Sequence, residues 1–234
     1  MTWDRNSFIA AGIVALGIII GGYLLGDGLR RARMADRSVT VRGLAERDVT
    51  ADLATWSIAY TEQGTELGPV QTAIDQDTRA ITDFLRAAGF KDEEVSTAGV
   101  SVSQYYDSNR GVDSVTVRRR LLLRTNDVMK ARQAYARQFD LIRDGVAVEE
   151  GSGMTYNFTK LNDVKPAMIA EATKDARKGA EQFAEDSGAD VGGIKQATQG
   201  YFSIGARDGE DSGSGNDSPF QKVRVVTTID FYLD

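Results

Sequence analysis

Apolar residues form one uninterrupted run near the start of the chain and then recur at short, regular intervals. The run covers residues 8–25, reads FIAAGIVALGIIIGGYLL and contains neither a charge nor a proline. As a helix it would be about 27 Å long at about 1.5 Å per residue, close to the bilayer core of about 30 Å. We interpret it as an uncleaved transmembrane anchor after a short N-tail, residues 1–7. The side chains expected to contact lipid are Phe8, Ile9, Ile13, Val14, Leu16, Ile18, Ile19, Ile20, Tyr23, Leu24 and Leu25.

Two other interpretations of this run stay open. A buried core helix would normally carry one polar face, and the run has none. A cleaved signal peptide would have an apolar region of about 7–15 residues followed by a small-residue site. Here the run is longer, and Arg33 stands two residues before Ala35, where such a site would place a small residue.

Residues 26–37 are expected to form a basic juxtamembrane linker. Arg30, Arg31 and Arg33 suit contact with lipid phosphates, and solvation accounts for them equally well. Before the run stand only Arg5 and the terminal amine, offset by Asp4. The positive-inside rule therefore favours a cytoplasmic position for the domain that follows.

The remaining chain, residues 38–234, alternates between strand and helix periodicities. Period-two patterns predict two strands within 38–64, then strands within 91–106, 112–126, 145–160, 195–204 and 221–232. Helical spacing predicts helices over 66–88, 127–142 and 163–187. The order β-β-α-β-β-α-β-α-β-β, with hairpins between helices, predicts an α+β fold of antiparallel strands with packed helices.

Three details within this pattern concern packing. Gly43 falls where a strand would bend or bulge. Arg119 interrupts the inner face of its strand, which indicates an edge, a bulge or a paired buried charge. The third helix repeats small residues every four positions, which permits close approach to a neighbouring element. This stripe consists of Met168, Ala172, Ala176, Ala180 and Ala184.

Composition restricts the chemistry available to the chain. The 234 residues carry a net charge of −6 and contain no histidine and no cysteine. The charge gives a nucleic-acid partner no electrostatic support. The chain has no thiol for catalysis or redox switching, and it lacks the commonest general base and metal ligand. About 200 residues after the run suit one domain or two small intertwined ones.

The remaining candidate sites favour structural interpretations. A mobile loop explains the acidic residues of segment 205–219 better than a metal site, because EF-hand spacing is not met. These residues are Asp208, Glu210, Asp211 and Asp217. No G-x-S-x-G elbow supports Ser152 as a nucleophile. Tyr105 and Tyr106 beside residues 118–120 form either a binding patch or ordinary cross-strand packing. No residue is therefore assigned a catalytic, cofactor-binding or metal-binding role.

Four segments together resemble the SIMPL domain family. They are VTVRGLAERDVTADLA at 39–54, LRAAGFKDEEVSTAGVSVSQYY at 85–106, EATKDARKGAEQFAEDSGADVG at 171–192 and the closing strand. The resemblance covers most of residues 38–234. It implies an α+β fold, homo-oligomers with a ring as one arrangement, and a periplasm-facing location in bacteria. It also implies a link to envelope integrity or oxidative-stress protection, and it supplies no catalytic residues.

The leading hypothesis is a non-enzymatic, self-assembling envelope protein, anchored by a single pass in the bacterial inner membrane. The resemblance places its domain in the periplasm, against the cytoplasmic side that the arginines favour. An alternative is a sensor module that binds a small molecule or a partner. A weaker alternative is a hydrolase that uses carboxylates. The physiological role, the ligand and the oligomer number stay open.

Overall fold

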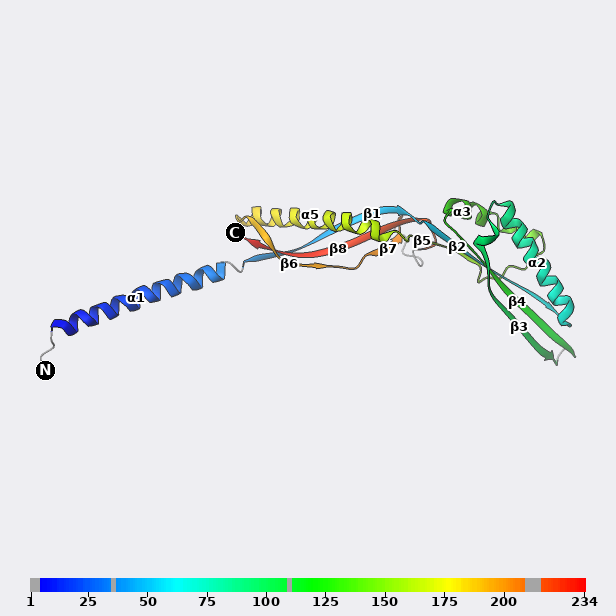
Figure 1. The fold of residues 1–234 in the computed structure, drawn as a ribbon, viewed down its shortest axis with the longest axis horizontal. Helices are drawn as coiled ribbons and strands as arrows, with labels where there is room; N and C mark the ends of the chain where they lie inside the picture. Colours follow the sequence, from blue (N-terminus) through cyan, green and yellow to red (C-terminus); the bar gives the residue numbers. More distant parts are fainter. Residues whose placement is uncertain (1–4, 35–36, 109–110, 209–215) are drawn as a thin grey trace. The chain divides into compact units, whose positions relative to one another are not determined.

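The first helix, α1, runs from Arg5 to Met34 and includes the whole apolar run (Figure 1). The computed structural model describes residues 5–34, 37–108, 111–208 and 216–234. Helix α1 continues through most of the segment that the sequence predicted as a linker. The side chains of residues 5–13 and 29–34 lie outside the described part, so the predicted lipid contacts of several residues cannot be placed. These residues are Phe8, Ile9, Ile13, Arg30, Arg31 and Arg33.

Large apolar side chains are exposed on α1 from residue 14 to residue 25. They are Val14, Leu16, Ile18, Ile19, Ile20, Tyr23, Leu24 and Leu25. Within the described part of the chain, no helix combines the length and the apolarity needed to cross a membrane.

The chain forms two compact units. The first comprises Met1–Ala45, Pro166–Phe202 and Arg224–Asp234. Its strands belong to a sheet of order β1-β8-β6. These strands are β1 Ser38–Thr50, β6 Val191–Gln199 and β8 Phe220–Leu233, and β7 Ser203–Ala206, which pairs with β8, falls within the second unit. Strands β6 and β8 are antiparallel.

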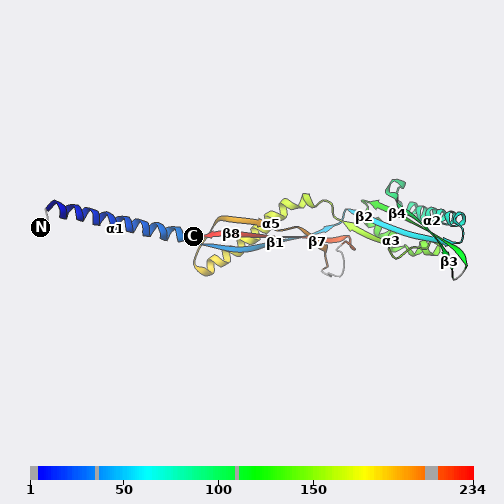
Figure 2. The same cartoon turned by 90° about the horizontal axis from the view of Figure 1, so that it is seen from below.

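Helix α5, Leu161–Ser187, lies along β1 and β8 (Figures 1 and 2). The small-residue stripe predicted from the sequence is confirmed, because all five of its members are buried. The stripe meets Val41 of β1 and the side chains of Ile229 and Phe231 on β8. The core of this unit therefore depends on a helix that carries almost no side-chain bulk on its inner face.

The second unit comprises Glu46–Lys165 and Ser203–Val223. Its main sheet has the order β3-β4-β2-β5, with every neighbouring pair antiparallel. The strands are β2 Leu53–Gly64, β3 Val95–Asp107, β4 Val112–Thr125 and β5 Gly153–Asn157. The helices of this unit are α2 Leu67–Ala87, α3 Val128–Ala136 and α4 Phe139–Arg143, and the short 3-10 helix η1 spans Asp92–Glu94.

Helix α2 forms where the sequence predicted a helix over 66–88. Its buried stripe is Val70, Ile74, Ile81 and Leu85, and the helix is followed by Gly89 at a φ of +89°. That left-handed conformation favours glycine and ends the helix. The stripe packs with Trp56, Ile58 and Tyr60 of β2 in the larger of two hydrophobic cores.

The strand pairing differs from the expected hairpins. Strands β3 and β4 do form a hairpin, but β1 and β2 belong to different sheets. Only Ala51 and Asp52 lie between β1 and β2, yet their partners are strands far along the chain. Alternation predicts that a strand has a buried face and leaves its hydrogen-bonding partner undetermined. The expected order is therefore right for the elements and wrong for this pair.

Two further elements also divide. The helix predicted over 127–142 becomes α3 and α4, because residues 137 and 138 bond back three positions in a tight turn. The turn reorients the second piece, so that Leu141 is buried while Phe139 and Ile142 are exposed. The strand predicted over 195–204 is likewise divided into β6 and β7.

Candidate functional site

Strand β3 is the edge of the second unit's main sheet and is exposed along most of its length. It is hydrogen-bonded to β4 on one side, and it stands at the end of the strand order. Residues 95–106 carry no charged side chain. Edge strands in soluble proteins are usually protected by lysine, proline or a covering element, because their free backbone groups attract other strands.

Apolar side chains on β3 face the same side of the sheet as the core but are left uncovered. In the antiparallel register Val102 lies opposite the buried Val117, and Val100 lies opposite Arg119. Val100 is 58% exposed and Val102 is 50% exposed. Tyr106, on the same face, is 64% exposed. The core face of the sheet therefore continues outward as an apolar row, Val100, Val102 and Tyr106, which Gln104 interrupts opposite Val115.

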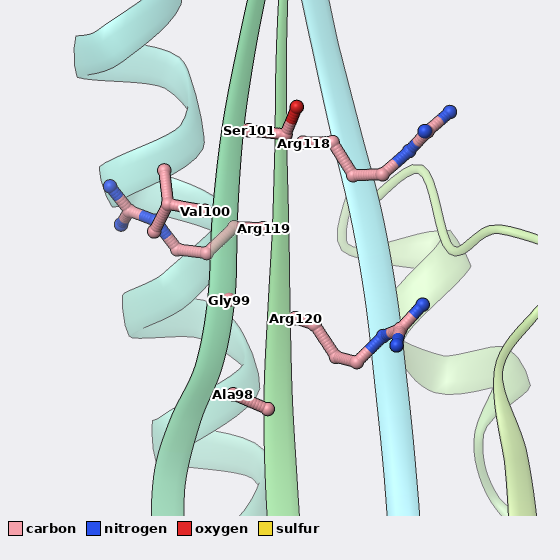
Figure 3. A pocket seen from close by; sticks show the side chains of 7 residues that line it. All are labelled: Ala98, Gly99, Val100, Ser101, Arg118, Arg119 and Arg120. Atoms are coloured by element: carbon pink, nitrogen blue, oxygen red, sulfur yellow. The ribbon is translucent and has the colours of Figure 1, made fainter.

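A bulge in β3 creates a shallow hollow beside this row. The register between β3 and β4 shifts between Thr97 and Gly99, so Ala98 has no direct partner. A Cβ on Gly99 would meet nothing within 4 Å. The hollow has a volume of about 200 Å³ and is lined by residues 98–101 of β3 and 118–120 of β4 (Figure 3).

The three arginines of β4 divide between the two faces of the sheet. In Figure 3, Arg119 points toward α2, whereas Arg118 and Arg120 point to the opposite side. Arg119 Nη1 lies 2.7 Å from Asp75 Oδ1 and donates to Thr78 Oγ1 at 2.8 Å. Of the three expectations for Arg119, the paired, half-buried charge is the one observed.

The outward arginines carry most of the positive charge at the hollow. Arg118 Nε lies 2.7 Å from Glu149 Oε1. Arg120 has no ion pair within the described part of the chain. Guanidinium groups bind carboxylates and phosphates through paired N–H donors. The hollow is smaller than the roughly 300–1,000 Å³ of ordinary ligand pockets, so it suits one anionic group at most.

A second polar cluster lies between β2 and α2. The Tyr60 hydroxyl lies 2.6 Å from Thr78 Oγ1, and burial raises the pKa of Tyr60. Burial also raises the pKa of Asp77 to about 6, and the negative charge of Glu62 adds to the shift. Asp77 Oδ2 is buried and accepts no hydrogen bond from any described residue. This arrangement affects the pH dependence of stability, and no described group points to a reaction there.

Ser152 and Asp208, which the sequence singled out, make contacts within the fold. Ser152 Oγ accepts from Ala59 N at 2.9 Å and donates to Ala59 O at 3.1 Å. Asp208 pairs with Arg207 at 2.9 Å. Glu210 and Asp211 lie outside the described residues. Among the described residues no group of acidic side chains is arranged to hold a metal ion.

The sequence pointed to Tyr105, Tyr106 and the arginines but missed the role of β3 as an edge. Tyr105 pairs with Ser114 and Tyr106 with Asp113, so both belong to the exposed hairpin. The absence of charge through residues 95–106 was a signal that could have suggested an unprotected edge. Which strand occupies the edge depends on the sheet order, and periodicity does not specify that.

Comparison with known proteins identifies a family whose model covers most of the chain. Residues 39–231 match the family model described as "SIMPL: Protein of unknown function (DUF541)". No curated protein matches the chain. A crystal structure of a hydrolase from Listeria innocua aligns with 81% of this chain and 91% of its own, at 15% identity and a TM-score of 0.20. A TM-score that low supports no argument about fold or activity.

Proposed function

The chain belongs to the SIMPL family, and from that premise we propose that it is a non-enzymatic protein that self-assembles through the edge of β3. The carrying observation is the long edge strand, uncharged over residues 95–106, beside an uncovered apolar row. An added strand would satisfy the free backbone groups of β3 and bury Val100, Val102 and Tyr106 at the same time.

A second copy of the same strand suits this edge. Residues 95–106 bring no like charges together when two β3 strands pair. Their serines can lie opposite polar or apolar side chains of the second strand. The apolar rows would then adjoin and continue one core face into the next. An antiparallel pairing of identical strands is isologous, which is the symmetry of the commonest homodimers. Larger closed assemblies require a second interface, which this proposal does not assign.

The test measures the mass of full-length protein in detergent by light scattering. We expect a discrete oligomer for the wild type and a smaller species for Val102→Lys, because lysine at an edge opposes strand addition. Met129→Lys is the matched control, since Met129 is also an exposed apolar residue but lies on α3. The proposal fails if Val102→Lys keeps the wild-type mass, or if the wild type is monomeric at all concentrations.

We propose further that α1 anchors the assembly to a bacterial inner membrane. The exposed apolar side chains of residues 14–25 support this, because contact between an apolar surface and water is unfavourable and contact with lipid removes it. The proposal gives Phe8, Ile9 and Ile13 the same lipid-facing role. Arg30, Arg31 and Arg33 would meet the headgroups. In this location the assembly would contribute to envelope integrity or to protection against oxidants, in which a chain without cysteine acts indirectly.

A further inference from the structure

A cavity in the second unit lies away from the β3 edge and is bounded by α3, β5 and the residue Asp217. Its volume is about 480 Å³, within the range of roughly 300–1,000 Å³ typical of ligand sites. Arg132, Tyr135, Met154, Tyr156 and Asp217 supply its functional lining. The cavity therefore combines one cation, one anion, two phenols and a thioether.

The rigid side of the cavity is aromatic and apolar. Tyr156 and Met154 are buried on β5, and the Tyr135 ring lies 5.3 Å from the Trp56 ring in an edge-to-face contact. Met154 pairs with Trp56 across the sheet, so Met154, Trp56 and Tyr135 share one packed surface. A surface of this kind suits an apolar or aromatic group, which gains from both burial and ring contacts.

The two charges of the lining are not neutralised by each other. Arg132 and Asp217 line the same cavity, yet no ion pair of either is found within residues 5–34, 37–108, 111–208 and 216–234. Arg132 instead lies over the Phe220 ring, 5.6 Å from its centroid. An aromatic ring attracts the guanidinium without using its N–H donors as a carboxylate would, so the donors stay available.

We propose that this cavity binds a zwitterionic small molecule, an α-amino acid with an apolar or aromatic side chain. Its carboxylate would pair with Arg132, its ammonium with Asp217, and its side chain would pack on Tyr135 and Met154. A simple anion would leave Asp217 as a repelling neighbour, and a simple cation would meet Arg132. Only a ligand that carries both charges can form an ion pair with Arg132 and with Asp217 at the same time. The inference is independent of self-assembly through β3.

The charges of Arg132 and Tyr135 influence the pKa of the Tyr156 phenol. Burial raises the pKa of Tyr156, the positive charge of Arg132 opposes that rise, and Tyr135 adds to it. The phenol therefore stays neutral at physiological pH and can donate a hydrogen bond to a bound carboxylate. This contact would supplement the Arg132 pair.

Titration calorimetry on the full-length protein in detergent tests the proposal with three matched probes. We expect saturable binding of L-phenylalanine. Phenethylamine, which lacks the carboxylate, and 3-phenylpropionate, which lacks the ammonium, should each bind about tenfold more weakly or worse, because each leaves one charged wall unpaired. Equal affinity for all three, or no saturable binding of L-phenylalanine, would overturn the proposal. This comparison uses the wild type and does not depend on any variant folding.

Variants then place the binding in this cavity. Arg132→Gln and Asp217→Asn should each weaken L-phenylalanine binding by about tenfold or more, whereas Arg132→Lys should retain part of it. Arg79→Gln is the control, since Arg79 is an exposed arginine on α2 outside the lining. Circular dichroism confirms that each variant is folded. Wild-type affinity in both Arg132→Gln and Asp217→Asn would overturn the assignment.

Discussion

Asp77 is the residue whose protonation the fold changes most clearly. It lies on α2 facing β2, where Glu62 adds a like charge and where the charge of Asp77 itself contributes to the raised pKa of Tyr60. The local cation, Arg119, bonds to Asp75 and Thr78 and leaves Asp77 Oδ2 without a donor among the described residues. Burial, followed by the charge of Glu62, therefore raises the pKa of Asp77 from 3.8 to about 6.

This shift predicts a stability that declines as the pH rises. The folded protein holds the Asp77 proton more tightly than the unfolded chain, so the free energy of unfolding falls between about pH 4 and pH 6. Asp77→Asn removes the ionised form and should raise the free energy of unfolding at pH 7 by about 1 kcal/mol, a figure reduced because the side chain is only half-buried. Urea denaturation at pH 4 and pH 7 measures this, and the gain should shrink at pH 4. A gain of equal size at both values would contradict the assignment.

Gly43 makes the most sterically demanding contact of the first unit. A Cβ at this position would collide with the carbonyl oxygen of Ala172 and lie 2.6 Å from Ala176 N. Helix α5 is further tied to β1 by a hydrogen bond of 2.9 Å from the backbone N–H of Leu44 to the side-chain Oδ2 of Asp175. Gly43 therefore serves a close helix–strand approach, whereas the sequence suggested a bend or bulge.

Gly43→Ala should destabilise the protein by about 3 kcal/mol, at the upper end of ordinary overpacking, because backbone atoms must move. Thermal unfolding followed by circular dichroism measures the loss. Gly193→Ala is the control, since a Cβ on Gly193 of β6 meets nothing within 4 Å. If both variants melt like the wild type, the close approach of α5 to β1 is wrong.

At the scale of elements, the alanine stripe of α5 makes a second packing prediction. Ala176 is completely buried against β1 and β8. Ala176→Leu should therefore lower the free energy of unfolding by about 1–3 kcal/mol through overpacking. Lys178→Leu places the same side chain on the exposed face of the same helix and should be nearly silent. Chemical denaturation compares the two, and equal effects would mean that the stripe is not the packed face.

The elements themselves were largely predictable, because burial imposes a period on each one. The stripes of α2 and α5 and the alternation of β2 follow directly from that period. What periodicity did not reveal depends on contacts far apart in sequence. The separation of β1 from β2 depends on β8 and β4, and the exposure of β3 depends on its place in the sheet order. The break at residues 137–138 contains neither glycine nor proline, so it left no turn signal in the sequence.

The candidate site was also predictable only in part. Tyr105, Tyr106 and residues 118–120 stood out as an aromatic and basic cluster, and the structure places them on one hairpin but at different positions along it. The tyrosines pair with Ser114 and Asp113, whereas residues 118–120 pair with residues 99–101. The cavity around Arg132 and Tyr156 did not stand out, because α3 and β5 meet only in the folded second unit. Asp217 was singled out only as a member of the acidic loop.

At the scale of the whole molecule, the apolar run predicts how the chain partitions between membrane and water. Ile18→Arg places a charge near the middle of residues 8–25 and should cost about 2.5–3.5 kcal/mol of insertion free energy. The variant should become soluble or be degraded. Ile18→Leu is the control, because it keeps the apolar surface. Immunoblots of carbonate-washed membranes measure the distribution, and full retention of Ile18→Arg would contradict the anchor.

For the proposed anchor, two arguments disagree about which side of the membrane residues 38–234 would occupy. Arg30, Arg31, Arg33 and Arg37 follow the run, while Arg5 precedes it, and charge alone would keep the arginine-rich side in the cytoplasm. We propose the periplasm, as the SIMPL resemblance implies, with the short N-tail as the retained end. The charge rule is a bias that the first helix can override.

Fusions at Asp234 measure this sidedness directly. A reporter enzyme that is active only after export should be active there, and one that is active only in the cytoplasm should be silent. Adding Ile18→Arg to the exported fusion should abolish its activity, because export of the domain depends on insertion of the run. Replacing Arg30, Arg31 and Arg33 by glutamine should leave export intact or increase it, since those charges oppose translocation. The reverse pattern, with only the cytoplasmic reporter active, would place the domain in the cytoplasm and turn the proposed envelope role into one at the inner face of the membrane.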